Sequence, residues 1–267
     1  MRVVAVHPDA LVLTSWMWQT NAVLLRSARE EGIYEAMLVD SPYFPDELDA
    51  LPALGREAGF EVEALLATHA DFDHLLGRLA FPGLALGVGA ATLERLQAEP
   101  GAAQRDLREA DSEHYVRRER PLQLGALQEL PVPGRLELGD GELELHAARG
   151  HTADGTAILA PHAGVLLSGD YLSDVEIPVI SPGGSLEDYR ATLARLAPLV
   201  DAAEQIVPGH GSPHDRDRAL RVLDEDLGYL DALERGEERP SLPGGRDTRR
   251  QRSIHAGNLA VCDSLAD

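Results

Sequence analysis

The sequence predicts an α+β fold in which two mixed β-sheets pack together and helices cover them outside. Short apolar runs of strand length recur along the chain, and several stop at Gly, Asp or His. These runs come first in hairpin-like order and then alternate with longer segments of helical periodicity. The chain has 267 residues, of which 44% are hydrophobic and 26% charged, which suits one layered domain and rules out wholesale disorder.

Ten short segments have the length and the β-branched content of strands, although their Leu and Ala residues blur the distinction from helices. The predicted strands cover residues 2–6, 10–14, 22–26, 36–39, 64–67, 84–88, 143–147, 156–159, 165–167 and 205–207.

Longer segments show helical patterning, and the best defined follows Ser185, which is a good N-cap with Asp188 at the capping-box position. Residues 99–120 are rich in Arg, Glu and Gln and predict a helical insertion or a solvated surface segment. Residues 234–252 combine Pro, Gly and charge, so we expect a loose connection to a short C-terminal helix. The predicted helices cover residues 45–58, 89–97, 186–199 and 213–235.

Composition excludes several classes of function. The 45 acidic and 24 basic residues give a formal charge of -21, which would repel a nucleic acid. All basic residues are Arg, so lysine Schiff-base and P-loop chemistry are excluded. The single cysteine, Cys262, excludes an internal disulfide and a multi-cysteine metal site. No segment approaches roughly 20 apolar residues, and no leader-like segment opens the chain. We therefore expect a cytoplasmic protein with no membrane partner.

His, Asp and Gly gather at four places, each within a few residues of the end of a predicted strand. Strand ends hold side chains rigidly at one edge of a sheet, so four such ends can converge on one spot. The four motifs are 68–74 (THADFDH), 150–152 (GHT), 169–170 (GD) and 208–211 (PGHG).

The spacing in the first motif allows one loop to serve two metal ions. His69 and Asp71 are two residues apart and project to the same side of an extended segment, whereas Asp73 and His74 are adjacent and diverge. Two ions roughly 3.5–4 Å apart could then be held, each with an open position for water. The other candidates are His151 for the first site, His210 for the second, and Asp170 as the bridge between them.

The ordered motifs resemble the metallo-β-lactamase-fold superfamily over about residues 21–210, and residues 185–199 followed by 206–211 look most like its glyoxalase II-like branch. The resemblance implies a four-layer αββα sandwich, which we place at residues 1–235 with the insertion at about 99–120. We expect the extension at 236–267 to pack on the same domain. The resemblance carries over six metal ligands by position: His69, Asp73, His74, His151, Asp170 and His210.

The implied activity is metal-dependent hydrolysis. Two divalent ions, zinc foremost, would supply a hydroxide that attacks a thioester, an ester-like bond or a lactone of a small molecule. Asp73 is also the catalytic candidate, because it is placed to orient this hydroxide or shuttle its proton.

The first motif departs from the usual His-x-His-x-Asp-His, because Asp71 stands at the second His position. Asp71, Asp73 and Asp170 would set three carboxylates against two dications and shift the metal preference toward Fe or Mn. Alternatively, Asp71 accepts a hydrogen bond and orients a histidine. Flavodiiron members carry Glu at this position, so an iron-dependent oxidoreductase is an alternative function. A small phosphodiesterase and a non-catalytic binding module are the others.

Candidate substrate contacts lie outside the motifs. Trp16 and Trp18 alternate at a predicted hairpin tip that overlies the active site in this superfamily, where they could grip an apolar substrate. Packing in the core or in a homodimer explains them equally well. His214 could line the pocket or simply open a helix as a polar residue.

Overall fold

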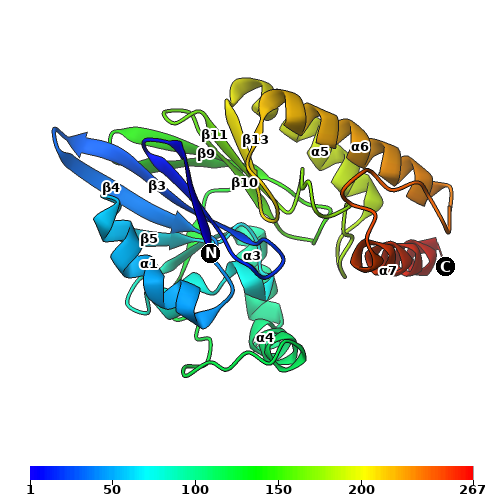
Figure 1. Ribbon diagram of the computed structural model, residues 1–267, viewed down its shortest axis with the longest axis horizontal. Helices are drawn as coiled ribbons and strands as arrows, with labels where there is room; N and C mark the ends of the chain where they lie inside the picture. Colours follow the sequence, from blue (N-terminus) through cyan, green and yellow to red (C-terminus); the bar gives the residue numbers. More distant parts are fainter. Residues whose placement is uncertain (267) are drawn as a thin grey trace.

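A helix layer, two β-sheets and a second helix layer lie on one another in the computed structural model, which describes residues 1–266 (Figure 1). The seven-stranded sheet has the order β1-β2-β3-β4-β5-β6-β7, and the six-stranded sheet has the order β13-β12-β11-β10-β9-β8. The predicted α+β sandwich is therefore confirmed. No helix in this described part of the chain has both the length and the hydrophobicity needed to cross a bilayer.

The seven-stranded sheet begins as an antiparallel meander and continues in parallel. Strands β1 to β4 pair antiparallel, whereas β4 to β7 pair parallel through helical crossovers. The strands are β1 (Arg2–His7), β2 (Ala10–Thr14), β3 (Asn21–Glu30), β4 (Ile33–Val39), β5 (Val62–Leu66), β6 (Leu86–Gly89) and β7 (Leu127–Leu130).

The six-stranded sheet is antiparallel except for the pairing of β11 with β12, which a helix connects. Because a parallel pair needs a crossover, the helix between these two strands returns the chain to the same edge. The strands are β8 (Gly134–Leu138), β9 (Gly141–Ala147), β10 (Thr156–Ala160), β11 (Val165–Gly169), β12 (Gln205–Pro208) and β13 (His214–Asp215).

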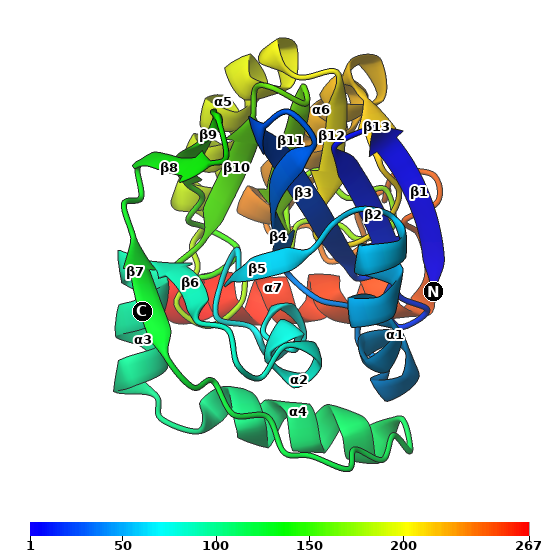
Figure 2. The ribbon, with the colours of Figure 1, turned by 90° about the vertical axis from the view of Figure 1, so that its left-hand side faces the viewer.

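Helices cover the outer faces of both sheets, as Figures 1 and 2 show from two directions. On the seven-stranded sheet lie α1 (Pro45–Glu57), α2 (Gly77–Ala80), α3 (Ala90–Ala98) and α4 (Ala102–Glu113). On the six-stranded sheet lie α5 (Leu186–Ala202) and α6 (Arg216–Glu234), with α7 (Arg249–Ala266) beyond them.

Three apolar cores hold the four layers together. The middle core joins the sheets and includes Val12 and Leu25 from one and Leu143 and Val165 from the other. A second core lies between the seven-stranded sheet and α1 to α4, and a third between the six-stranded sheet and α5 to α7. Burial of alternate apolar residues on both faces of each sheet drives this stacking.

The structure corrects several predicted elements. All ten predicted strands exist, β2 with the predicted bounds and the others with altered ends, but β7, β8 and β13 were missed. Strands β8 and β9 form a hairpin around Gly139-Asp140, a turn that the alternating leucines on either side signal. Helix α6 begins at Arg216 rather than at 213, because the two residues before it form β13 and Asp215 is its N-cap.

The segments outside the core motifs also differ in part from expectation. The region 99–120 contains helix α4, which ends at Glu113. The C-terminal helix is not short, since α7 begins at Arg249 and runs to Ala266. The last position of the predicted extension, residue 267, lies outside the described residues. Inside the extension, Asn258 Oδ1 accepts from the backbone N–H of Ile180 at 2.9 Å, so α7 is tied to the loop after β11.

Candidate metal centre

Loops that follow β5, β9, β11 and β12 bring the predicted ligands to one place between the two sheets. Their nitrogen and oxygen atoms form groups in which all ligand atoms lie within 4.8 Å of one another. We call His69, Asp71 and His151 the first ligand group, and Asp73, His74 and His210 the second ligand group.

Asp170 lies between the two ligand groups. Its Oδ2 atom is 3.6 Å from His69 Nε2, 3.3 Å from His151 Nε2 and 3.4 Å from His210 Nε2. Its Oδ1 atom is 3.3 Å from His74 Nε2. One carboxylate therefore faces imidazoles of both groups, which is the geometry a bridging ligand requires.

Buried polar atoms without hydrogen-bond partners mark the same place. They are Nε2 of His69, His74 and His151, together with Oδ1 of Asp170. A buried polar atom without a partner destabilises the fold, and native structures contain few of them. Convergent imidazole nitrogens and carboxylate oxygens are ligands that suit Zn, Fe and Mn, so the residues fit divalent cations.

The outer nitrogen of each histidine contacts an oxygen, which directs Nε2 toward the centre. His74 Nδ1 lies 3.0 Å from Asp40 Oδ2, and this carboxylate also accepts from the backbone N–H and the hydroxyl of Thr68. The other outer contacts are Thr68 Oγ1 to His69 Nδ1 at 3.0 Å, the Val179 carbonyl to His151 Nδ1 at 2.8 Å, and the Trp18 carbonyl to His210 Nδ1 at 3.2 Å.

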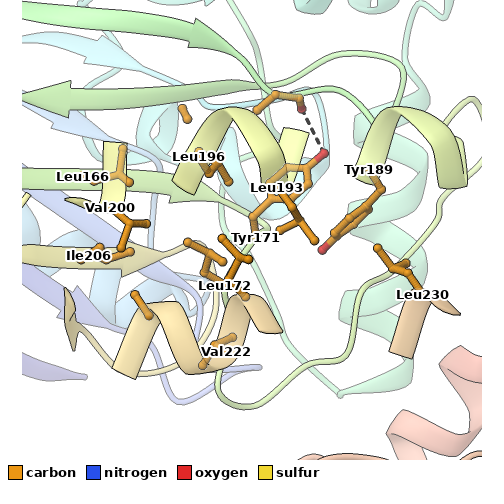
Figure 3. Packing of buried hydrophobic residues seen from close by; sticks show 14 of the residues in the cluster. Leu166, Tyr171, Leu172, Tyr189, Leu193, Leu196, Val200, Ile206, Val222 and Leu230 are labelled. Carbon is orange, nitrogen blue, oxygen red and sulfur yellow. Dashed lines mark hydrogen bonds between the residues drawn. The ribbon is translucent and has the colours of Figure 1, made fainter. Parts of the chain in front are cut away.

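Two tyrosines, Tyr189 of α5 and Tyr171 after β11, attach the ligand loops to the core between the six-stranded sheet and α5 to α7. The rings of Tyr171 and Tyr189 pack against each other among the leucines of this core, with their centroids 4.5 Å apart (Figure 3). The Tyr171 hydroxyl accepts from the backbone N–H of His151 at 2.9 Å, and the Tyr189 hydroxyl donates to the Asp170 carbonyl at 3.2 Å. Apolar packing of the helix layer thus fixes two ligand-bearing loops.

The loop that carries His210 is joined to the other sheet. The Asn21 backbone N–H donates to the Gly209 carbonyl at 2.7 Å, and the Asn21 side chain donates to the Pro208 and Gly211 carbonyls. Position 209 has no space for a side chain, because a Cβ there would lie 2.0 Å from Asp170 Oδ1. The PGHG motif therefore needs its first glycine for close approach to the bridging carboxylate.

Imidazoles and carboxylates shift one another's pKa in the protein without ions. Burial alone lowers the pKa of His151, but the neighbouring carboxylates of Asp71 and Asp170 raise it to about 9. Burial likewise opposes protonation of His210, yet the carboxylates of Asp170 and Glu176 raise its pKa to about 10. Burial raises the pKa of Asp170, but the neighbouring histidines hold it well below its usual value.

The predicted substrate residues occupy three different environments. Trp16 is 76% exposed at the hairpin tip. Trp18 packs edge-on against Tyr43, Phe72 and His114. His214 is buried, and its Nε2 atom lies 3.1 Å from the Leu172 carbonyl, a position that does not favour contact with a substrate.

Trp18 is one of the hairpin residues that contact the metal centre. Its carbonyl contacts His210, and the Arg250 guanidinium of α7 lies 5.3 Å above its ring. Arg250 also pairs with Glu176 at 2.8 Å, so the C-terminal helix reaches the same rim. A cavity of about 510 Å³ lies elsewhere, between α4 and residues 116–122, and none of the candidate ligands lines it.

Three residues around the centre were missed by the sequence analysis: Asp40, Arg95 and Asp154. Asp40 directly follows β4, so the rule that polar residues gather at strand ends could have found it. Arg95 lies on α3 and Asp154 on the β9–β10 loop, and only the packing brings them to Asp71. No local pattern in the sequence indicates that contact.

Comparisons with known proteins agree with this geometry. The sequence profile described as the metallo-beta-lactamase superfamily matches residues 16–210. The acyl-coenzyme A thioesterase MBLAC2 of Gallus gallus is 28% identical over 218 residues, which cover 76% of each chain.

Solved structures with the same architecture include a metallo-beta-lactamase family protein of Thermus thermophilus. That protein has a TM-score of 0.69 and 23% identity, and the match covers 98% of this chain and 94% of the other. A double mutant of the sec-alkyl sulfatase PisA1 has a TM-score of 0.72 and 15% identity, over 98% of this chain and 50% of the other. Likeness at these identities establishes the shared fold.

Proposed function

Because this chain belongs to the metallo-β-lactamase superfamily and is a metallo-hydrolase, we propose that it hydrolyses acyl thioesters of small molecules. The observation that carries the proposal is the placement of Asp170 between the two ligand groups, with unpartnered Nε2 atoms facing it. The similarity to a chicken acyl-coenzyme A thioesterase supports a thioester over a lactone or another ester.

We propose two divalent cations, with zinc foremost, one held by each ligand group and both by Asp170. Such ions, when bound, polarise a carbonyl and lower the pKa of water to near neutrality. The chain's own contribution is orientation, because the protein contacts on the outer histidine nitrogens leave each Nε2 free to ligate.

Asp73 is the proposed proton-handling group. Its Oδ2 atom lies 3.5 Å from His210 Nε2 and 3.9 Å from His74 Nε2, and the Asp73 carbonyl accepts from Ser41 Oγ at 2.8 Å. A carboxylate fixed in this way can hold the attacking water in line with a carbonyl and accept its proton. Trp18, with its aromatic neighbours, offers an apolar wall at the rim for an acyl chain.

The test is a matched panel of substrates on one preparation of known zinc content. Acyl-coenzyme A thioesters, a lactone and an aromatic phosphodiester are compared by thiol release, ring opening and phenolate release. We expect the highest kcat/KM for a thioester and its loss on chelation. Cleavage of only the phosphodiester by protein holding two zinc ions per chain would contradict the proposal, and so would full activity of metal-stripped protein.

Asp71 supports one further candidate, an iron-dependent oxidoreductase on the same fold. A carboxylate in the first ligand group favours harder ions than a third imidazole would. Elemental analysis of protein purified without added metal, together with its visible spectrum, separates the two functions. Iron with a charge-transfer band would favour redox chemistry, whereas zinc without absorption supports hydrolysis. Cytoplasmic location and a homodimer stay predictions.

A further inference from the structure

Asp71 directs its two oxygens to different partners. Its Oδ2 atom faces the two histidines of the first ligand group, at 3.6 Å from His69 Nε2 and 3.4 Å from His151 Nε2. Its Oδ1 atom lies 2.8 Å from Nη2 of Arg95 on α3. The carboxylate is thus shared between the metal centre and a guanidinium.

Arg95 also contacts a second acid, which fixes it in place. Its Nη1 atom donates to Asp154 Oδ1 at 2.9 Å, and the other oxygen of Asp154 accepts from the backbone N–H of Ala70 at 2.9 Å. Ala70 stands between His69 and Asp71 in the motif loop. Asp154 is fully buried, and its two oxygens hold both the Arg95 guanidinium and the loop that carries Asp71.

Charge explains why this arrangement matters. A neutral imidazole at position 71 would add no charge to the centre, whereas a carboxylate adds one negative charge. Arg95 supplies one positive charge in direct contact and so balances the charge that Asp71 adds, whereas Asp154 contributes one negative charge whichever residue stands at position 71. The planar fork of an Arg can hold two carboxylates with fixed geometry, which a Lys cannot.

We propose that Arg95 is a positioning residue that allows a carboxylate to serve in the first ligand group: it orients Asp71 Oδ2 toward the ion and offsets the added negative charge. The inference rests on the metal centre of the proposed function. It concerns metal retention, which can be measured without any substrate. Positions 71 and 95 are then coupled, because the effect of a substitution at one of them on zinc affinity depends on the residue at the other.

The experiment measures zinc content and zinc affinity by chelator competition in four proteins: wild type, Arg95→Met, Asp71→His, and the double variant. We expect Arg95→Met to weaken binding of one of the two ions by about 10–100-fold, as loss of a residue that orients a ligand does. Asp71→His alone should also weaken this ion, because Arg95, still held by Asp154, then directs its second N–H group and its positive charge at an imidazole instead of a carboxylate. The double variant should recover affinity to within a few-fold of wild type.

Two further variants make the outcome specific. Arg105→Met removes an exposed guanidinium of α4 and should leave both affinities unchanged. Arg95→Lys keeps the charge without the fork and should fall between wild type and Arg95→Met. Thermal unfolding of each metal-free variant shows whether it is folded. If Arg95→Met does not fold, Arg95→Lys and Asp71→His, which both keep a positive charge beside Asp154, decide the question.

The results separate this inference from the proposed function. Wild-type protein that binds two ions, together with Arg95→Met protein that binds both equally well, would overturn the inference alone. A double variant that is no better than the single variants would overturn it too. A wild type that binds no zinc, iron or manganese would overturn the proposed metal centre itself.

Discussion

The two ligand groups of the centre are built differently. In the second ligand group the His74 side chain is completely buried, the Asp73 side chain is 11% exposed, and the carboxylate of Asp40 supports the imidazole from behind. In the first ligand group the Asp71 side chain is 26% exposed, and a surface helix supports it through Arg95. The second ligand group is thus a buried anchor, whereas the first is the more open side and carries the departure from the superfamily pattern.

The difference shows where substitution can be compensated. A change behind His74 would have to be absorbed by a closed core, because Asp40 also holds the Thr68 backbone and hydroxyl. A change at position 71 can be matched by one guanidinium reaching in from α3. The following predictions test this contrast, from the largest expected effect to the smallest.

Asp170→Ala removes the one carboxylate that both ligand groups share. We expect loss of both ions and a fall of hydrolysis to the level of metal-free protein, because Asp170 is the one acid among the described residues that pairs with imidazoles of both groups. His74→Ala should have the same effect on turnover. Metal analysis and thiol-release rates measure both results. Retention of two tightly held ions by Asp170→Ala would contradict the bridging role.

Gly209→Ala tests the close packing on the side of the second ligand group. The new methyl group would meet Asp170 Oδ1, so the loop or the carboxylate has to move. We expect metal-free stability to fall by about 1–3 kcal/mol, as overpacking does, and zinc affinity to fall as well. Gly228→Ala on α6 is the control, since a Cβ there meets nothing within 4 Å. Equal behaviour of the two variants would remove the argument for a steric requirement.

Asp40→Asn tests the support of the second ligand group. The amide still fills the space but no longer offers a charged acceptor to His74 Nδ1. We expect zinc affinity to fall by about 10–100-fold and metal-free stability to fall as well, because the amide has one oxygen to accept from the Thr68 backbone and hydroxyl where the carboxylate has two. The larger of the two losses of zinc affinity, that of Asp40→Asn or that of Arg95→Met, identifies the stronger support. If the buried anchor is the stronger constraint, no substitution at position 74 will restore the zinc affinity of Asp40→Asn.

The pH dependence of stability should reverse when metal is added. The folded pKa values of His151 and His210 are raised to about 9 and about 10, above the ordinary value of about 6.5. In metal-free protein their stabilisation is therefore complete below pH 6.5 and is lost as the pH rises through 9 to 10. Zinc needs neutral imidazoles, so stabilisation by zinc should grow over the same range. Melting temperatures from about pH 6 to about pH 10 with and without zinc test this.

Much of the centre could be predicted because its motifs are local. Each cluster follows an apolar run that predicts a strand, and the residues after a strand lie at the edge of the sheet whatever its neighbours are. His151, Asp170 and His210 could therefore be predicted without knowledge of the packing. The two-sheet class followed from the order of strands and helices in the same way.

The parts that could not be predicted depend on contacts between distant elements. Arg95 lies in a helix whose periodicity indicates only its buried side, and its partner Asp154 is 59 residues away. The length of α7 was underestimated because polar residues, Asn258 among them, hold it to the loop after β11. Hydrophobic periodicity does not report contacts of this kind.

The tie between Asn21 and the Pro208–Gly211 turn has a consequence for the order of assembly. The ligands of the two groups come from loops of both sheets, and this tie, with the contacts of Trp18 and Gln19, holds the His210 loop against the β2–β3 hairpin. An ion can therefore be captured at full strength only after the two halves have come together. Zinc uptake during refolding would then follow the docking of the two sheets. A zinc-loaded chelator dye mixed with the refolding protein would report this uptake as one late change in its signal.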